Sequence, residues 1–376
     1  MIGDVYEVDE TNLAFEPTTR PVPAEERARL LADPGFGRVF TDHMAIIEYD
    51  EQKGWHDARI TARHPFKMDP ASPVLHYAQE IFEGLKAYRR PGGGAALFRP
   101  DANARRFAKS AIRLAMPPLP EEMFLDSVRG LVRADREWIP STEDGSLYLR
   151  PFMIANGSFL GMRPSTQFIY AVIASSVGSY FKNDAPNVSL WVTREYVRAA
   201  PGGTGEAKCG GNYAGSLVAQ AEAARNGCDQ VVFLDAVERR WVEELGGMNV
   251  FFVFDDGSLQ TPPLTGTILP GITRDSLITA LAVLPAQPDV ADHHQDSVRR
   301  CVPGAVPIPN VGSSHCLQVA HPADDRATVR RGDEGAGQRG ALDGGCQLPP
   351  ASRTATAPAA TRASAWPAAH RCWRPM

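Results

Sequence analysis

Large aromatic side chains stop well before the end of this 376-residue chain, which limits where a hydrophobic core can form. No Tyr follows Tyr213, no Phe follows Phe254, and the only aromatic residues after that point are Trp366 and Trp373. The last part of the chain shows no sustained helical or alternating periodicity, and few large side chains offset the entropy of ordering it. We therefore predict that residues 284–376 are largely unstructured and that the fold is built before them.

The composition of this tail allows two explanations. Natural disordered extensions are usually rich in Ser, Gln, Glu or Lys. This segment is instead rich in Ala, Arg, Pro, Gly, His and Cys, and no lysine follows Lys208. Such a mixture is typical of a GC-rich coding region read in a shifted frame, so the tail is either aberrant in this sense or a natural disordered extension.

The body of the chain alternates between two kinds of pattern. Short apolar or β-branched runs bounded by Gly, Pro and charged turns predict strands, whereas apolar residues at three-to-four spacing predict amphipathic helices. The expected strands are 44–50, 85–88, 95–98, 146–154, 168–174, 188–194, 230–234, 240–243 and 249–254, and the expected helices are 101–116 and 121–139. This pattern indicates an α+β, or mixed α/β, fold.

A connector containing Gly, Pro and Asn gives the clearest domain boundary, at residues 176–186. It divides the body into a smaller N-terminal α/β domain, residues 1–175, and a larger second domain that begins at residue 187 and continues to residue 283. Two domains also agree with the length of the chain, since a single domain typically has 100–200 residues.

Charge and hydropathy exclude several classes of partner. The chain has 39 Lys and Arg against 44 Asp and Glu, a net charge of −5, which is too balanced for a broad basic surface that binds nucleic acid. The N-terminus lacks the features of a signal peptide, and no apolar run is long enough to span a membrane. The cysteines have no regular spacing and are expected to be free thiols, with no metal site. Together these features predict a cytoplasmic protein.

Candidate chemistry concentrates around Lys208, which lies between two glycine clusters and before an alanine-rich helix. Burial would lower the pKa of this amine, as a Schiff-base lysine requires, although a surface lysine in a flexible loop is the alternative. A phosphate-binding loop of the Walker type needs Gly before the lysine and Ser or Thr after it. Here Ala207 and Cys209 occupy those positions, and no strand leads into a G-x-G-x-x-G turn, so nucleotide-binding loops are not favoured.

Five separated motifs together resemble the branched-chain amino acid aminotransferases, which are fold-type IV enzymes dependent on pyridoxal 5′-phosphate. The motifs are LHYAQEIFEGLKAY at 75–88, SLYLRP at 146–151, KCGGNY at 208–213, ELGGMN at 244–249 and LPGITRDSL at 269–277. The resemblance covers roughly residues 10–283. It implies a two-domain enzyme of branched-chain amino acid biosynthesis, which transfers the amino group between Leu, Ile or Val and 2-oxoglutarate.

The resemblance also implies roles for residues that would bind the cofactor. Lys208 corresponds to the catalytic lysine that bonds to the cofactor and moves protons. Glu244 corresponds to the acid beside the pyridine nitrogen, and Tyr213 to the tyrosine at the phenolic oxygen. The phosphate would be bound by Arg106 and by the main chain at the start of a helix, where N–H groups lack partners. The main-chain ligands implied there are Ile272 and Thr273.

The residues that match the family's substrate pocket are mostly aromatic, as expected for apolar side chains. They are Tyr77, Phe82, Tyr148, Arg150 and Tyr180, the last on the interdomain connector. For the aromatic residues, ordinary core packing is the alternative. Because the family places some of these positions across a subunit interface, the resemblance implies a homodimer or a larger homo-oligomer.

The sequence departs from the family pattern at about residue 283, where the aberrant composition begins. The cofactor-binding domain, residues 187–283, is therefore expected to be incomplete and to lack a glycine-threonine turn that contacts the phosphate in the family. Two alternatives remain for the function. One is a D-amino acid aminotransferase or aminodeoxychorismate lyase of the same fold, and the other is an inactive remnant.

Overall fold

The computed structural model describes residues 5–7, 12–142, 144–178, 188–253, 258–283, 300–303 and 315–319. By internal contacts, Met1–Gly332 form one compact unit and Asp333–Met376 a second, and every described residue belongs to the first. The domain boundary predicted at 176–186 falls mostly outside the described residues and stays a prediction.

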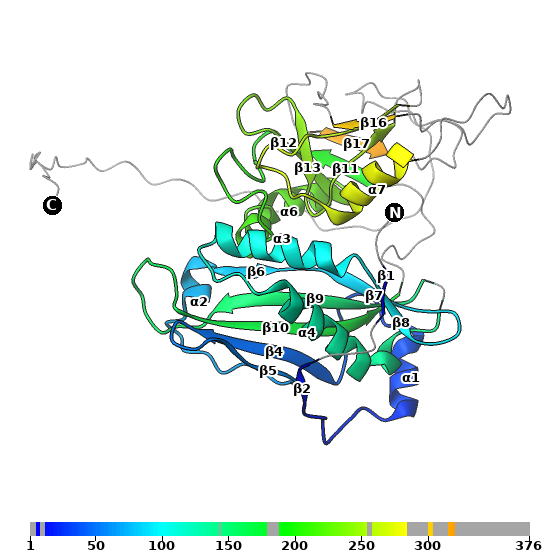
Figure 1. Cartoon of the computed structure of the whole chain (residues 1–376). Helices are drawn as coiled ribbons and strands as arrows, with labels where there is room; N and C mark the ends of the chain where they lie inside the picture. The colour runs from blue at the N-terminus through cyan, green and yellow to red at the C-terminus, as the bar shows by residue number, and fades with distance from the viewer. Residues whose placement is uncertain are drawn as a thin grey trace, which may run out of the picture. The chain divides into compact units, whose positions relative to one another are not determined.

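Ten of the described strands form one large sheet (Figure 1). Its order is β1-β8-β7-β9-β10-β4-β5-β2, with β3 pairing β10 and β6 pairing β9. All of these pairs are antiparallel except β2 with β5. The strands are β1 (Val5–Glu7), β2 (Ala14–Phe15), β3 (Val39–Phe40), β4 (His43–Asp50), β5 (Gly54–Ala62), β6 (Glu80–Phe82), β7 (Leu85–Arg89), β8 (Ala95–Phe98), β9 (Ser146–Ala155) and β10 (Gln167–Val177).

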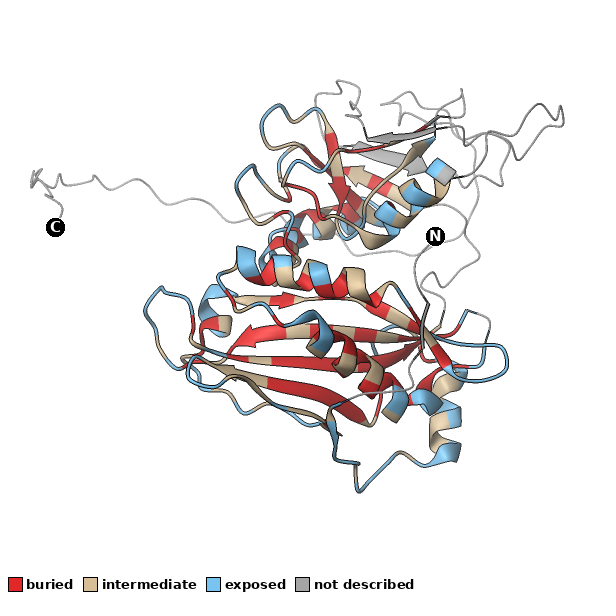
Figure 2. Cartoon of the chain, viewed as in Figure 1, coloured by how far each residue is buried: buried red, intermediate tan, exposed pale blue. Residues whose placement is uncertain are grey.

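Two amphipathic helices, α3 (Pro100–Arg113) and α4 (Glu121–Ala134), pack against this sheet (Figures 1 and 2). Their buried residues recur at helical spacing, and the rings of Phe107 and Phe124 lie 5.4 Å and 6.1 Å from that of Tyr170 on β10. The Tyr170 hydroxyl lies 2.9 Å from Ser127 Oγ, so this buried polar group is satisfied, and burial raises its pKa. The main core therefore lies between these helices and the sheet.

Helix α4 ends at Ala134, five residues before the predicted end. The next residue, Asp135, is buried and accepts hydrogen bonds from the backbone N–H of His43 at 3.0 Å and from its ring Nδ1 at 2.7 Å. A short 3₁₀ helix follows at Arg136–Trp138. The apolar periodicity continues past the true helix end because Trp138 and Ile139 are also buried, but in non-α-helical backbone.

Shorter helices flank these elements. They are α1 (Ala24–Ala32) and α2 (Pro73–Tyr77), with Pro73 at the first helical position of α2. No helix among the described residues is long and apolar enough to cross a membrane.

The second part of the chain forms two smaller sheets (Figure 1). One has the order β13-β12-β11-β17, and the other β14-β15-β16. The elements are β11 (Val188–Val192), α5 (Gly210–Ala214), α6 (Leu217–Arg225), β12 (Gln230–Leu234), β13 (Val242–Leu245), β14 (Phe252–Val253), β15 (Ser258–Thr261), α7 (Ile272–Val283), β16 (Arg300–Pro303) and β17 (His315–Val319). The mixed helix and strand content confirms the predicted fold class.

Two of these strands lie in the segment predicted to be largely unstructured. β16 pairs in parallel with β15, and β17 pairs with β11 in antiparallel register. The remainder of that segment lies outside the described residues. Short strands form there because β11 and β15 each present an edge whose backbone groups need partners.

The prediction of free thiols is confirmed for Cys209, which is buried and unbonded. It is wrong for Cys228, which is disulfide-bonded. The spacing of the cysteines in the sequence gives no signal for this bond. No group of His, Cys, Asp and Glu in the described part of the chain is placed to hold a metal ion.

Candidate active site

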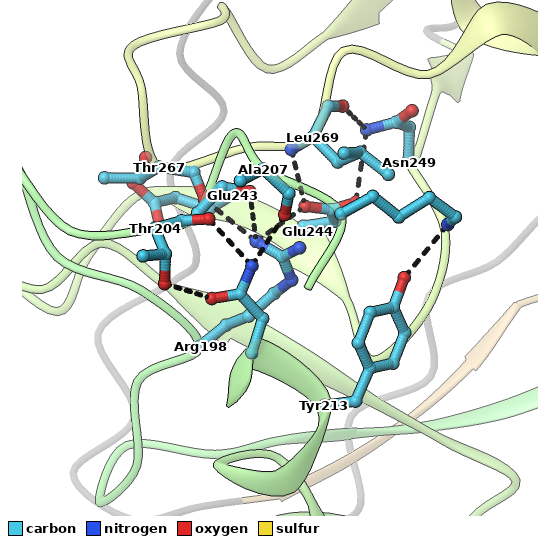
Figure 3. A network of polar contacts seen from close by, with 12 residues as sticks. Arg198, Thr204, Ala207, Tyr213, Glu243, Glu244, Asn249, Thr267 and Leu269 are labelled. Carbon is cyan, nitrogen blue, oxygen red and sulfur yellow. Dashed lines mark hydrogen bonds and ion pairs between the residues drawn. The ribbon is translucent and has the colours of Figure 1, made fainter. Parts of the chain in front are cut away.

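The backbone of Lys208 is fixed from two sides before helix α5 begins. Its N–H donates to Ser110 Oγ of α3 at 3.0 Å, and its carbonyl accepts the N–H of Phe82 of β6 at 2.9 Å. The side chain of Asn212 donates to the carbonyls of Thr204 and Ala207, both at 2.8 Å, and accepts from the Thr204 hydroxyl at 2.7 Å (Figure 3). The loop that carries the lysine is therefore held by hydrogen bonds, which disfavours the alternative of a flexible surface lysine.

The Lys208 amine lies among aromatic groups. Nζ donates to the Tyr213 hydroxyl at 3.1 Å and lies 5.0 Å from the ring centroid of Phe82. Burial lowers the pKa of this amine to about 8, although the carboxylate of Glu83 acts in the opposite direction. A larger share of this lysine is therefore neutral near physiological pH than of an exposed lysine, and only the neutral amine is a nucleophile.

Glu244, on β13, is buried at 2% exposure and held by three groups (Figure 3). Arg198 Nη1 lies 3.0 Å from Oε2, the Leu269 N–H donates to Oε2 at 3.1 Å, and Asn249 Nδ2 lies 3.4 Å from Oε1. Burial raises the pKa of Glu244, while the Arg198 guanidinium and the Leu269 N–H favour the carboxylate. The charge of Lys208 also acts on this carboxyl, so the two predicted residues belong to one electrostatic environment.

Arg198 connects Glu244 to the loop before α7. It donates to the carbonyls of Thr267 at 2.9 Å and Gly205 at 3.3 Å. The Thr267 hydroxyl in turn donates to Glu243 at 2.6 Å. Figure 3 shows these residues as one network, with Tyr213 at its edge. The orientation of Glu244 therefore depends on several chain segments.

Arg106, on α3, is turned toward the loop that precedes α7. Its guanidinium contacts the Glu83 carboxylate through Nε at 2.7 Å and Nη2 at 2.8 Å, and Nη1 donates to the Pro270 carbonyl at 3.1 Å. Burial alone would lower the pKa of Arg106, but attraction to Glu83 outweighs it and raises the pKa. The group is thus a permanent cation.

Ile272 and Thr273 form the first turn of α7, so their backbone N–H groups have no acceptor within the helix. Arg99 fixes this helix start to the beginning of α3, donating to Ser276 Oγ at 2.6 Å and to Asp275 Oδ2 at 2.7 Å. The contact of Arg106 with Pro270 brings the arginine to the same place. A cation beside a helix N-terminus is suited to a phosphate group.

Three of the predicted substrate residues join the lysine. The guanidinium carbon of Arg150 lies 4.8 Å from the ring centroid of Phe82 and 5.3 Å from that of Tyr148, and Nη2 donates to the Tyr148 hydroxyl at 2.8 Å. The Phe82 ring also lies 5.0 Å from that of Tyr213. Phe82 and Tyr213 therefore lie beside the amine, and Arg150 and Tyr148 join the cluster next to Phe82.

Of the other two predicted substrate residues, Tyr77 is not brought to this cluster by any described contact. Tyr77 is 40% exposed at the end of α2, and its hydroxyl donates to the Leu160 carbonyl. No described contact joins it to Lys208 or Phe82. Tyr180 lies outside the described residues.

Sequence reasoning missed the groups that orient the predicted residues, namely Arg198, Glu83 and Asn249. Arg198 lies ten residues before the lysine, in an irregular stretch with no recognisable pattern. Glu83 lies within the motif at 75–88, and Asn249 lies within the motif at 244–249. The one local signal for either residue is a polar side chain among apolar neighbours. Their partners lie far along the chain, which no local spacing reveals.

Comparison with known proteins agrees with this geometry. The family model of amino-transferase class IV matches residues 80–291. A probable branched-chain-amino-acid aminotransferase of Streptomyces coelicolor is 55% identical over 268 residues, which is 71% of this chain and 74% of that protein. A branched-chain-amino-acid aminotransferase of Mycolicibacterium smegmatis is 56% identical over 264 residues, 69% of this chain and 72% of that protein.

Among solved structures, the T.th. branched-chain amino acid aminotransferase with pyridoxamine 5′-phosphate has a TM-score of 0.56. It is 26% identical to this chain and is matched over 74% of this chain and 83% of its own. The chain therefore belongs to the class IV aminotransferases, a family of pyridoxal-phosphate-dependent enzymes. The predicted resemblance to branched-chain aminotransferases is confirmed by the two relatives.

The described residues fit this cofactor. An amine with a lowered pKa suits an aldehyde, and a buried carboxylate paired with Arg198 suits a pyridine nitrogen. Arg106 beside the start of α7 suits a phosphate. Lys208, Glu244 and Arg106 thus suit the aldehyde, the pyridine nitrogen and the phosphate of pyridoxal 5′-phosphate, respectively.

Proposed function

We propose that this chain is a branched-chain amino acid transaminase, which moves an amino group between Leu, Ile or Val and 2-oxoglutarate in a ping-pong cycle. The observation that carries the proposal is the Lys208 amine, with its lowered pKa, among Tyr213, Phe82 and Arg150. Identity of 55–56% to relatives named as branched-chain aminotransferases supports the choice of substrate class.

Each residue has a role that its contacts allow. When bound, the cofactor supplies an electron sink for the bond broken at the substrate's Cα. Lys208 Nζ would take the Cα proton of the amino acid and give it back to a carbon of the cofactor. Glu244, whose carboxylate form is favoured by Arg198, would hold a proton on the pyridine nitrogen.

The groups around the amine select the substrate. Phe82 and Tyr148 present apolar ring surface to the side chain, as branched aliphatic groups require. Arg150, which lies beside both rings, offers a cation for a substrate carboxylate. The phosphate roles of Arg106, Ile272 and Thr273 follow from their position around Pro270.

Further parts of the proposal concern assembly and location. We expect a homodimer or larger homo-oligomer, because Leu160, whose carbonyl accepts from Tyr77, is 65% exposed, and Met162 is 91% exposed. A second copy would cover them and bring Tyr77 to a substrate site. We also expect the protein in the cytoplasm. The proposed domains are residues 1–175 and 187–283, joined by the 176–186 connector, with Tyr180 near the substrate.

The test is glutamate formation from 2-oxoglutarate, measured with L-Leu, L-Ile and L-Val as amino donors. We expect turnover with all three and none after Lys208→Ala, while Lys109→Ala on the exposed face of α3 remains active. Turnover with D-alanine alone would favour the D-amino acid enzyme, and pyruvate release from aminodeoxychorismate would favour the lyase. A folded chain without any turnover would identify an inactive remnant.

A further inference from the structure

Glu83 is a fully buried carboxylate between β6 and β7, with an exposure of 0%. Its own N–H donates to the Pro151 carbonyl at 2.7 Å, so the backbone at this point is fixed to β9. Its Oε2 also accepts a hydrogen bond from Asn103 Nδ2 of α3 at 2.7 Å and from the Gly84 N–H at 3.2 Å. A buried carboxylate with this many donors is held in one orientation, since any rotation would leave polar groups unsatisfied.

This orientation presents both carboxylate oxygens to one edge of the Arg106 guanidinium. Oε1 accepts from Nε at 2.7 Å and Oε2 from Nη2 at 2.8 Å, which is a bidentate pair. A guanidinium has five N–H groups. Two are used by Glu83 and one by the Pro270 carbonyl at 3.1 Å. Two remain, one on each terminal nitrogen, without an acceptor among the residues that the structure describes.

The consequence is geometric. With Nε and Nη2 bound to Glu83, the plane of the guanidinium is fixed, and its remaining donors are directed at a single place beside the start of α7. We propose that Glu83 is a positioning residue, which aims Arg106 at the cofactor phosphate. This inference rests on the proposed function and extends it to a residue that touches neither substrate nor cofactor.

A simple charge argument predicts the opposite effect. Glu83 carries a negative charge close to the proposed phosphate subsite, so removing it would strengthen attraction between Arg106 and the phosphate. In Glu83→Gln, however, the new amide N–H₂ faces an N–H of Arg106. Two donors then meet in a buried place, and the guanidinium must turn away. Positioning therefore predicts weaker phosphate binding, and charge removal predicts stronger.

The experiment compares two aldehydes that differ only in the phosphate, pyridoxal 5′-phosphate and pyridoxal. Their dissociation constants for the full chain are measured by absorbance, with borohydride trapping to verify attachment at Lys208. Glu83 also raises the pKa of Lys208, so Glu83→Gln affects the amine as well. Both aldehydes use the same amine, so the ratio of the two constants reports the phosphate subsite alone.

We expect Glu83→Gln to reduce the preference for the phosphorylated aldehyde by about tenfold or more, as loss of hydrogen bonds to a charged group predicts. Asn103→Ala, which removes one support of Glu83 and keeps the ion pair, should reduce it by a smaller factor. Glu48→Gln breaks a half-exposed pair with Arg59 at 3.4 Å on the sheet and should leave the ratio unchanged. Asn103→Ala also provides the test if Glu83→Gln does not fold.

The outcomes separate this inference from the function on which it rests. If wild type binds neither aldehyde at Lys208, the proposed function fails and this inference fails with it. If wild type prefers the phosphorylated aldehyde, and Glu83→Gln and Asn103→Ala keep or increase that preference, only the positioning role of Glu83 is overturned.

Discussion

The Lys208 amine and the Glu244 carboxyl are each shaped by burial, with opposite results. Burial penalises the charged form, so it lowers the pKa of the amine and raises that of the carboxyl. For the amine the shift is useful, because the neutral form reacts. For Glu244 it is harmful to the proposed role, and Arg198 opposes it from 3.0 Å.

The pKa of Lys208 sets a pH dependence for its reaction with the cofactor. A protonated amine does not attack an aldehyde, so the rate should rise with pH through about 8 and level off above it. Stopped-flow absorbance of apoenzyme mixed with pyridoxal 5′-phosphate, from pH 6 to pH 10, measures this midpoint. A midpoint near 10.5, the ordinary value for lysine, would show that the amine is not desolvated.

Glu244→Gln should abolish measurable turnover while leaving cofactor attached to Lys208. The amide keeps the size of the side chain but cannot hold a proton on the pyridine nitrogen, and it leaves Arg198 without its counter-ion. The folding cost of removing one partner of a buried pair is about 3–5 kcal/mol. Assays of L-Leu turnover and bound cofactor measure the two effects, with Glu121→Gln at the exposed first residue of α4 as control. Unchanged turnover would refute the assigned role.

At the scale of elements, the sequence predicts most of the helices and strands around the site, and the misses have physical causes. β5 (Gly54–Ala62) gives no clear alternation, since Ile60 is its one fully buried residue. Residue 240 was expected to begin a strand, but β13 starts at Val242 because Arg240 and Trp241 donate their N–H groups to Asp235. Motif resemblance located Lys208, Tyr213 and Glu244, whereas Arg198 and Glu83 required the tertiary structure.

Gly84 allows the close approach of β9 to the turn between β6 and β7. A Cβ at this position would run into the Tyr148 hydroxyl, so Gly84→Ala should displace Tyr148 from Arg150. We expect KM for L-Leu to rise about tenfold, in the range typical of overpacking, with cofactor affinity unchanged. Gly178→Ala is the control, since its Cβ would meet only Pro34 Cγ at 3.9 Å. Equal KM values in both variants would contradict the placement of Tyr148.

For the whole molecule, the prediction of an unstructured tail concerns residues that the structure mostly does not describe. β16 and β17 are the described parts of that segment, and both pair with strands of the preceding chain. Each pairing is a long-range contact that local composition does not predict. Local composition also does not predict the homodimer, which the sequence supports by family resemblance alone.

Limited proteolysis tests the tail. Residues after Val319 include few large apolar side chains that could protect them, so we expect a protease to cleave there before it cuts within α3 or α4. Mass spectrometry of the early fragments locates the first cut. Protection of the whole segment would show that it packs. Resequencing of the gene across codon 283 decides whether a shifted reading frame produced it.

The most direct test of the account is the location of the bond between protein and cofactor. The full chain is incubated with pyridoxal 5′-phosphate, reduced with borohydride, digested and mapped by mass spectrometry, with Lys208→Ala and Lys109→Ala treated in parallel. The account predicts a phosphopyridoxyl group on Lys208 in wild type and Lys109→Ala, and none in Lys208→Ala. A wild-type chain that carries no such group, or carries it on another lysine, would contradict the assignment of the active site.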